Sequence, residues 1–222
     1  MNYKAVIFDL DGTLLDSLKD IADTLNSVLA RNALPVLTIE TVRNIVGYGM
    51  RELIRQAIPH DHHGDEQFIR KLWEEMEKQY ADSWMHNTRP YPGIKELLDW
   101  LDSAGIKKGV LSNKPDRFTK LCVSSLLPGW TFQSVIGHQP LLNRKPDPEG
   151  ALEMAAAMET DPSDMVFIGD TDVDMQTAVA AGMYPLGVLW GFRSAEELLE
   201  NGAKKLVETP REVIAWLSQS QQ

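Results

Sequence analysis

The chain has 222 residues, of which 43% are hydrophobic, and it carries a formal net charge of −10 at pH 7. This length suffices for a sizeable core, and we expect one large domain plus an insert. The negative charge argues against nucleic acid and anionic membranes as partners, and no apolar stretch approaches the length of a membrane span. The single cysteine, Cys122, excludes an internal disulfide and suits a reducing, cytoplasmic location.

The first predicted element is a strand at Ala5–Phe8, an apolar run that ends in two carboxylates, Asp9 and Asp11. Alternation along an extended backbone lets these two side chains point the same way. Two like charges this close require a positive partner, and hard oxygen ligands favour Mg²⁺. Gly12 lets the chain turn sharply and approach a ligand closely. The alternative is a surface turn, in which Asp and Gly are common.

Helical periodicity replaces the strand pattern after Ser17, and apolar residues between Leu18 and Leu29 share one stripe. Further helices are predicted at Ile39–Val46, Met50–Ile58 and Glu66–Trp84. We therefore expect an all-helical insert at residues 15–89, carried by an α/β domain built from residues 1–14 and 90–222. Residues 14–17 and 88–92 are the expected hinges, and the second leads into a helix at Ile94–Ala104.

Two further apolar runs, Gly109–Leu111 and Met165–Ile168, each end in polar residues, and helical patterns separate them. This alternation predicts a parallel sheet, whose ligands bind at the carboxyl ends of the strands. An acidic cluster with one hydroxyl and one lysine suits an anion bridged to the protein by a metal, and we expect phosphate. The residues predicted at this edge are Asp9, Asp11, Ser112, Lys145, Asp170 and Asp174.

Four motifs in this order resemble those of the haloacid dehalogenase superfamily. They are Asp-x-Asp-Gly-Thr from Asp9, Ser-Asn-Lys from Ser112, Lys-Pro at Lys145 and Gly-Asp-Thr-x-x-Asp around Asp170. The resemblance spans the chain and implies an α/β fold, with a Rossmann-like parallel sheet core and an inserted all-helical cap domain. It also implies phosphoryl transfer, since the dehalogenase branch lacks an aspartate at the position of Asp11.

The resemblance further implies a role for each motif residue. Asp9 would be the nucleophile that forms an aspartyl-phosphate, and Asp11 the general acid and then the general base. The residues implied to hold the phosphoryl oxygens are Ser112 and Lys145. Those implied to hold Mg²⁺ are Asp9, the backbone carbonyl of Asp11, and Asp170, with Asp174 orienting or completing the shell. Gly12 lies in the phosphate-binding turn, and Thr13 and Asn113 either contact phosphate or only cap the turn.

The most distinctive stretch of the helical insert is Val46–Arg51, in which Gly47 and Gly49 open a helix. A helix start offers free N–H groups to an anionic substrate, and Arg51 adds a bidentate donor. The alternative is that the glycines only shape a tight turn. We interpret the histidine-rich loop at residues 60–63 as solvated, because its histidines lack the spacing of a zinc site.

Within the superfamily, Ser112–Pro115, Val46–Arg51 and Gly187–Arg193 look like the corresponding stretches of bacterial phosphoglycolate phosphatases. This similarity implies a Mg²⁺-dependent hydrolase of a small, acidic phosphorylated metabolite such as 2-phosphoglycolate. A phosphosugar mutase, a pyrophosphatase and a nucleotidase of the same fold are alternatives, and a non-catalytic binding domain is the most distant one. The sequence leaves both a monomer and a homodimer open.

Overall fold

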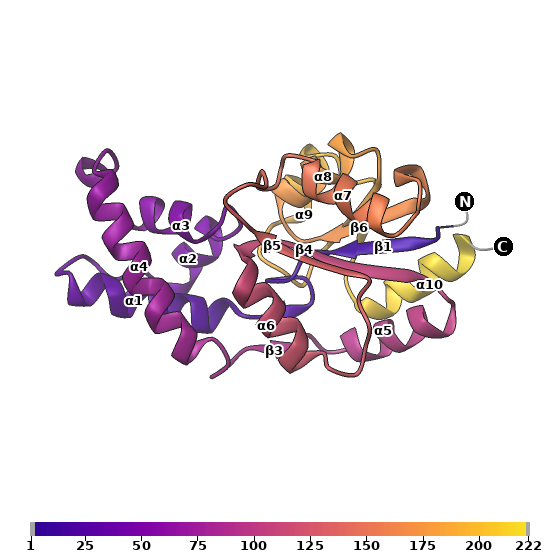
Figure 1. Ribbon diagram of the computed structural model, residues 1–222, viewed down its shortest axis with the longest axis horizontal. Coiled ribbons are helices and arrows are strands. Elements are labelled where there is room, and N and C mark those ends of the chain that lie inside the picture. Colours follow the sequence, from indigo (N-terminus) through magenta and orange to yellow (C-terminus); the bar gives the residue numbers. More distant parts are fainter. Residues whose placement is uncertain (1–2, 221–222) are drawn as a thin grey trace.

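A parallel six-stranded sheet forms the centre of the larger part of the molecule, and the computed structural model describes residues 3–220. The strand order is β5-β4-β1-β6-β7-β8, so β1 lies near the middle and later strands extend the sheet on both sides (Figure 1). The strands are β1 (Ala5–Phe8), β4 (Lys107–Pro115), β5 (Ser134–His138), β6 (Met165–Gly169), β7 (Tyr184–Val188) and β8 (Lys205–Val207).

Helices cover both faces of this sheet (Figure 1). Alternating residues of β1 divide between the two faces: Val6 and Phe8 join one hydrophobic cluster, and Ala5 and Ile7 join the other. The first cluster includes residues of α5 (Ile94–Ser103), α6 (Asp116–Leu126) and α10 (Pro210–Ser220). The second includes residues of α7 (Glu149–Ala157) and α8 (Asp172–Ala180), and α9 (Ala195–Glu200) packs beside α8. The predicted Rossmann-like α/β fold is confirmed.

Two features of the sheet differ from the sequence prediction. The strand predicted at Gly109–Leu111 extends to Pro115, so the polar Ser112–Lys114 stretch belongs to the strand and not to a loop after it. The register against β5 shifts between Leu111 and Pro115. Three short outer strands, β5, β7 and β8, were not predicted from the sequence. Polar residues, proline or glycine interrupt their apolar runs.

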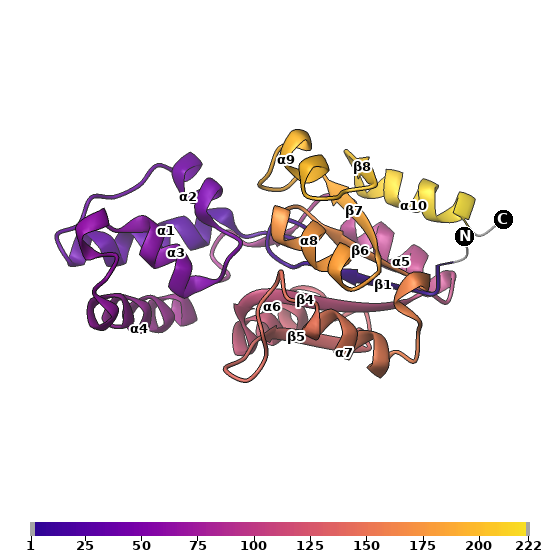
Figure 2. The ribbon, with the colours of Figure 1, turned by 90° about the horizontal axis from the view of Figure 1, so that it is seen from above.

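Residues 18–83, here called the helical segment, contain helices and no strand, and they lie beyond the carboxyl ends of the central strands (Figure 2). Its α-helices are α1 (Leu18–Arg31), α2 (Ile39–Ile45), α3 (Met50–Ala57) and α4 (Glu66–Ser83), with a 3₁₀ turn at His60–His62. Helix α4 begins where the Asp65 carboxylate accepts the backbone N–H of Phe68 at 2.9 Å. Within residues 3–220, no helix combines the length and hydropathy that crossing a membrane requires.

The two chain segments that join the helical segment to the sheet run side by side. They form a two-stranded antiparallel ribbon, β2 (Leu15–Asp16) paired with β3 (Arg89–Pro90). The buried carboxylate of Asp20, in the first turn of α1, strengthens this junction. It accepts hydrogen bonds from the backbone and side chains of Asn87 and Thr88 at 2.7–3.0 Å.

Candidate active site

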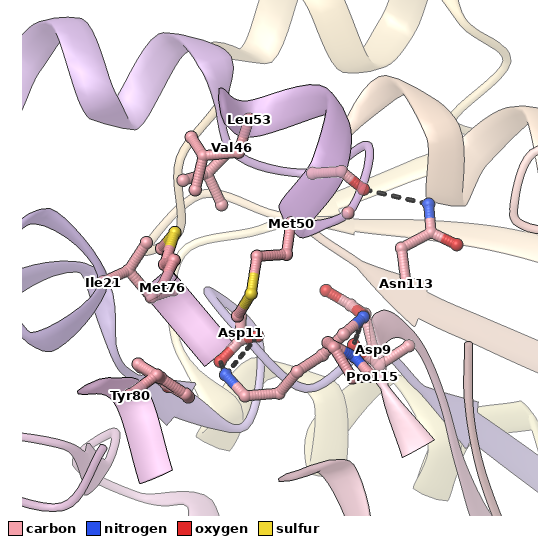
Figure 3. Close-up of a pocket in the computed structure, with 14 residues that line it drawn as sticks. Asp9, Asp11, Ile21, Val46, Met50, Leu53, Met76, Tyr80, Asn113 and Pro115 are labelled. Atoms are coloured by element: carbon pink, nitrogen blue, oxygen red, sulfur yellow. Dashed lines mark hydrogen bonds and ion pairs between the residues drawn. The ribbon is translucent and has the colours of Figure 1, made fainter. Parts of the chain in front are cut away.

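A cavity lies between the carboxyl ends of the strands and the helical segment (Figure 3). One side is polar and comes from the ends of β1 and β4, and the other side is mostly apolar and comes from α1, α3, α4 and the loop before α3. The lining residues are Asp9, Asp11, Ile21, Val46, Gly47, Gly49, Met50, Leu53, Met76, Tyr80, Ser112, Asn113, Lys114 and Pro115.

Three buried carboxylates meet at the polar end of the sheet. Ligand oxygens of Asp9, Asp170 and Asp174 all lie within 4.8 Å of one another. The ammonium of Lys145, itself buried, donates to Oδ1 of Asp9 at 2.7 Å and to Oδ1 of Asp174 at 2.6 Å. Three carboxylates with one ammonium leave an excess of two negative charges when all are ionised. A divalent cation matches both that charge and the all-oxygen donor set.

The protonation of this cluster reflects its burial. Burial raises the pKa of Asp9 to about 7, against the opposing effect of Lys145 and with reinforcement from Asp174. Burial, together with the charges of Asp9 and Asp174, also raises the pKa of Asp170 well above its ordinary range. Burial opposes the charge of Lys145, yet Asp174 and Asp9 raise its pKa, so its ammonium persists. A positive charge in addition to that of Lys145 is therefore needed to keep all three carboxylates ionised at neutral pH.

The position of Asp170 is fixed from two sides. Its oxygens accept hydrogen bonds from the Thr13 hydroxyl and the Phe192 backbone N–H, each at 2.8 Å. The Asp170 carboxylate occupies space that is free only because residues 12 and 191 are glycines. A Cβ atom at Gly12 would lie 2.2 Å from Asp170 Oδ2, and one at Gly191 would lie 2.4 Å from the same atom. Gly12 also has a φ of 92°, which a side chain would strain. Thr13 thus contacts Asp170 and not the cavity.

Asp174 occupies the first turn of α8, where it completes a capping box. Its Oδ2 accepts the backbone N–H of Thr171 at 3.0 Å and the Thr171 hydroxyl at 2.6 Å, and its Oδ1 faces Lys145. A Cβ at Gly169 would lie 2.3 Å from the Asp174 side chain. The Asp174 carboxylate therefore caps the N-terminus of α8 and is also a member of the acidic cluster.

Asp11 is separate from the acidic cluster. Its carboxylate accepts hydrogen bonds from the Lys114 ammonium at 2.8 Å on each oxygen (Figure 3). The Ser17 hydroxyl also donates to Oδ1 of Asp11 at 2.6 Å. Burial opposes the charge of Lys114, but Asp11 raises the pKa of that ammonium. Lys114 belongs to the Ser-Asn-Lys motif, for which no function of the lysine was predicted. Lys114 lies inside β4, and no local sequence pattern indicates that its ammonium pairs with Asp11.

Ser112 and Asn113 both line the cavity at the end of β4. The Ser112 Oγ accepts the backbone N–H of Lys114 at 3.3 Å. The Asn113 amide donates to two backbone carbonyls, that of Gly47 at 2.9 Å and that of Lys145 at 3.0 Å. Asn113 therefore connects the helical segment to the loop that carries Lys145.

The predicted substrate-binding loop divides into two parts. Gly47 and Gly49 line the cavity with positive φ values, and a Cβ at Gly49 would come within 3.0 Å of the Asn113 carbonyl oxygen. Arg51 is not among the residues that line the cavity. Its guanidinium pairs with Glu66 at 2.5 Å and is half-exposed. Because α4 begins beside it and offers this carboxylate, Arg51 is drawn to the neighbouring helix.

Two residues of the sheet domain that were not predicted as site residues, Asp172 and Arg193, hold the loop before α3 and the end of α2 in place. The Tyr48 hydroxyl donates to Asp172 at the start of α8. The Arg193 guanidinium donates to the carbonyls of Arg43 and Val46, each at 2.7 Å. These contacts join residues more than 120 positions apart in the chain, so no local sequence pattern could predict them.

Comparison with known proteins gives consistent results. The family model described as haloacid dehalogenase-like hydrolase matches residues 6–188. Phosphoglycolate phosphatase 1 of Pseudomonas aeruginosa is 34% identical over 98% of this chain and 80% of its own length. The phosphoglycolate phosphatase of Xylella fastidiosa strain 9a5c is 35% identical over 93% of this chain and 90% of its own length.

A solved structure of a protein from Lactobacillus delbrueckii subsp. bulgaricus has a TM-score of 0.91 and 30% identity to this chain. It covers 98% of this chain, and 99% of its own length is covered. The resemblance stated from the four motifs, and the expectation of an enzyme of the phosphatase class, are confirmed. The chain belongs to the haloacid dehalogenase-like hydrolase family.

Proposed function

We propose that this chain is a Mg²⁺-dependent phosphomonoester hydrolase that acts through a phosphoryl group carried by Asp9. The observation that carries the proposal is the buried cluster of Asp9, Asp170 and Asp174 bridged by Lys145, with oxygens within 4.8 Å of one another. Such a concentration of buried charge is costly without a compensating cation and is characteristic of functional sites. The three carboxylates are the residues that would hold Mg²⁺, which would supply positive charge against the phosphoryl oxygens.

The mechanism divides one difficult hydrolysis into two displacements. A carboxylate oxygen of Asp9 forms a bond to phosphorus while the bond from phosphorus to the leaving-group oxygen breaks, and Asp11 donates a proton to that oxygen. Water then forms a bond to phosphorus, Asp11 takes its proton, and the bond from phosphorus to Asp9 breaks. Lys145 and the Ser112 hydroxyl are proposed to hold the phosphoryl oxygens, so that their charge is neutralised throughout.

The separation of the two aspartates near β1 supports this division of work. Asp9 belongs to the acidic cluster, whereas Asp11 is outside it and lines the cavity beside the helical segment. A group that exchanges protons with a leaving group must face the space where that leaving group lies. Asp11 meets this requirement, and its hydrogen bond from Ser17 helps to orient it.

We also propose that residues 15–89 act as a cap that closes over the site and residues 1–14 and 90–222 as the catalytic domain. Support comes from the paired linkers β2 and β3 and from the contacts of Asn113 with the carbonyl of Gly47. A cap that excludes water strengthens the electrostatic interactions on which phosphoryl transfer depends.

For the substrate, we propose a small phosphorylated acid, with 2-phosphoglycolate first. The names of the curated relatives from Pseudomonas aeruginosa and Xylella fastidiosa support this choice. The alternatives with the same motifs, a phosphosugar mutase, a pyrophosphatase and a nucleotidase, have no contact in the described residues that favours them.

The test is phosphate release from 2-phosphoglycolate, glucose 1-phosphate, pyrophosphate and nucleoside monophosphates, with Mg²⁺ and with EDTA. We expect turnover that depends on Mg²⁺ and is fastest with 2-phosphoglycolate. Asp9→Asn should abolish it, whereas Asp61→Asn, at an exposed carboxylate on the 3₁₀ turn, should not. Substantial turnover by Asp9→Asn would show that Asp9 is not the nucleophile.

A further inference from the structure

The helical segment offers apolar contact but no positive charge to the cavity. Its contributions include Ile21, Met50, Leu53 and Met76, and Arg51 is turned to Glu66 instead. Among the residues that line the cavity, Lys114 is the only basic one. An anionic group on the part of a substrate that lies beyond the phosphoryl site therefore has one cation available to it.

Lys114 is held at the boundary between the two halves of the cavity. Its side chain is 5% exposed, and its ammonium donates to both oxygens of Asp11 at 2.8 Å. The same nitrogen lies 4.8 Å from the centroid of the Tyr80 ring, on α4 of the helical segment. An ammonium has three N–H donors, so the two contacts with Asp11 leave capacity for one more acceptor.

Tyr80 provides a second, independent observation. Its side chain is 1% exposed and lines the cavity, and its ring packs edge-on against Phe118 at 5.1 Å between centroids. Its buried hydroxyl lies near the Lys114 ammonium, which can only donate, and within the described residues no acceptor lies within hydrogen-bond distance of it. A buried hydroxyl whose O–H finds no acceptor is uncommon and costs free energy, so this O–H is available to an acceptor on a bound substrate.

We propose that Lys114 and the Tyr80 hydroxyl form the subsite that binds a carboxylate on the leaving group of the substrate. This inference rests on the proposed function and adds to it the residues that select the substrate class. Both groups are donors, they come from opposite sides of the cavity, and Lys114 adjoins Asp11, which must face the leaving-group oxygen. A carboxylate satisfies both donors at once, whereas an alkyl group of the same size satisfies neither.

The experiment compares 2-phosphoglycolate with ethyl phosphate, in which a methyl group replaces the carboxylate. The measured quantity is the ratio of kcat/KM for the two esters. Lys114→Met also removes the partner of Asp11, but that effect is shared by both esters and cancels in the ratio. We expect Lys114→Met to lower the ratio by about 10- to 100-fold, as expected for one hydrogen bond between charged groups.

Tyr80→Phe removes only the hydroxyl and keeps the ring against Phe118, so it tests the subsite even if Lys114→Met does not fold. We expect it to lower the ratio by about threefold or more, mainly through a higher KM for 2-phosphoglycolate. Met76→Leu, an apolar change in the same cavity, is the control and should leave the ratio unchanged. Turnover of both esters with an unaltered ratio in both test variants overturns the subsite alone. No turnover of either ester by the unmodified enzyme refutes the proposed function and the subsite with it.

Discussion

Replacing Gly191 with alanine should displace Asp170 from the acidic cluster. A methyl group there would lie 2.3 Å from the Asp170 Cβ and 2.4 Å from its Oδ2, and ordinary contact requires a shift of about 1 Å. The φ of Gly191 is not in the left-handed region, so the effect is steric. The same shift would lengthen the two 2.8 Å hydrogen bonds from Thr13 and Phe192 beyond hydrogen-bond range.

Two weakened hydrogen bonds to a buried carboxylate, together with overpacking, should lower the free energy of unfolding by about 2–4 kcal/mol after relaxation. For a chain of this length that corresponds to a fall in Tm of about 4–16 °C. A displacement of about 1 Å in the site should also lower kcat/KM by about 100-fold.

Thermal unfolding and phosphate release in the presence of Mg²⁺, the activity expected from the proposed function, measure the two effects on one preparation. Gly129→Ala is the matched control, because a Cβ there meets nothing within 4 Å, and it should alter neither quantity. If Gly191→Ala kept both the stability and the kcat/KM of the unmodified enzyme, the close approach of this backbone to Asp170 could not be what positions the carboxylate.

Three further results are expected. Asp20→Ala leaves four donors of Asn87 and Thr88, of which the two on Thr88 are buried, without their acceptor. The substitution should lower the free energy of unfolding in urea by about 2–4 kcal/mol, and an unchanged midpoint would contradict this. Because burial raises the pKa of Asp9 to about 7, the stability linked to its proton is lost as pH rises from about 4 through 7. Unfolding in EDTA should thus occur more readily at pH 8 than at pH 5, and a difference that Mg²⁺ fails to reduce would count against the metal site. Burial raises the pKa of Cys122 to about 11, so a thiol reagent at pH 8 should label it only after unfolding, and rapid labelling of the folded protein would contradict its burial.

The sequence was most informative where one short segment carries both the structure and the chemistry. β1 and β6 are uninterrupted apolar runs, and polar residues follow each directly, so the strand and its terminal carboxylates were predicted together. Residues brought together in the cluster, such as Asp9 and Lys145, were each predicted from their own motif.

Sequence reasoning was least informative about contacts between the helical segment and the sheet domain. Arg51 was expected at the substrate, but a local carboxylate, Glu66, takes it. Lys114 and Arg193 could not be assigned, because what they do depends on partners that only the folded chain brings near. The outer strands β5, β7 and β8 were missed because polar residues, proline or glycine interrupt their short apolar runs.

The junction between the two parts of the chain has a mechanical consequence. Leu15 bridges to Asp11, and Ser17, one residue beyond β2, donates to the Asp11 carboxylate. Because β2 and β3 are hydrogen-bonded to each other as one antiparallel ribbon, the two linkers must bend together. A swing of the helical segment about this ribbon would therefore move the side chain of Asp11, the proton donor in the proposed mechanism. We expect one movement both to enclose the substrate and to position Asp11 for proton transfer. An enzyme whose helical segment is only partly closed would therefore also have Asp11 poorly positioned.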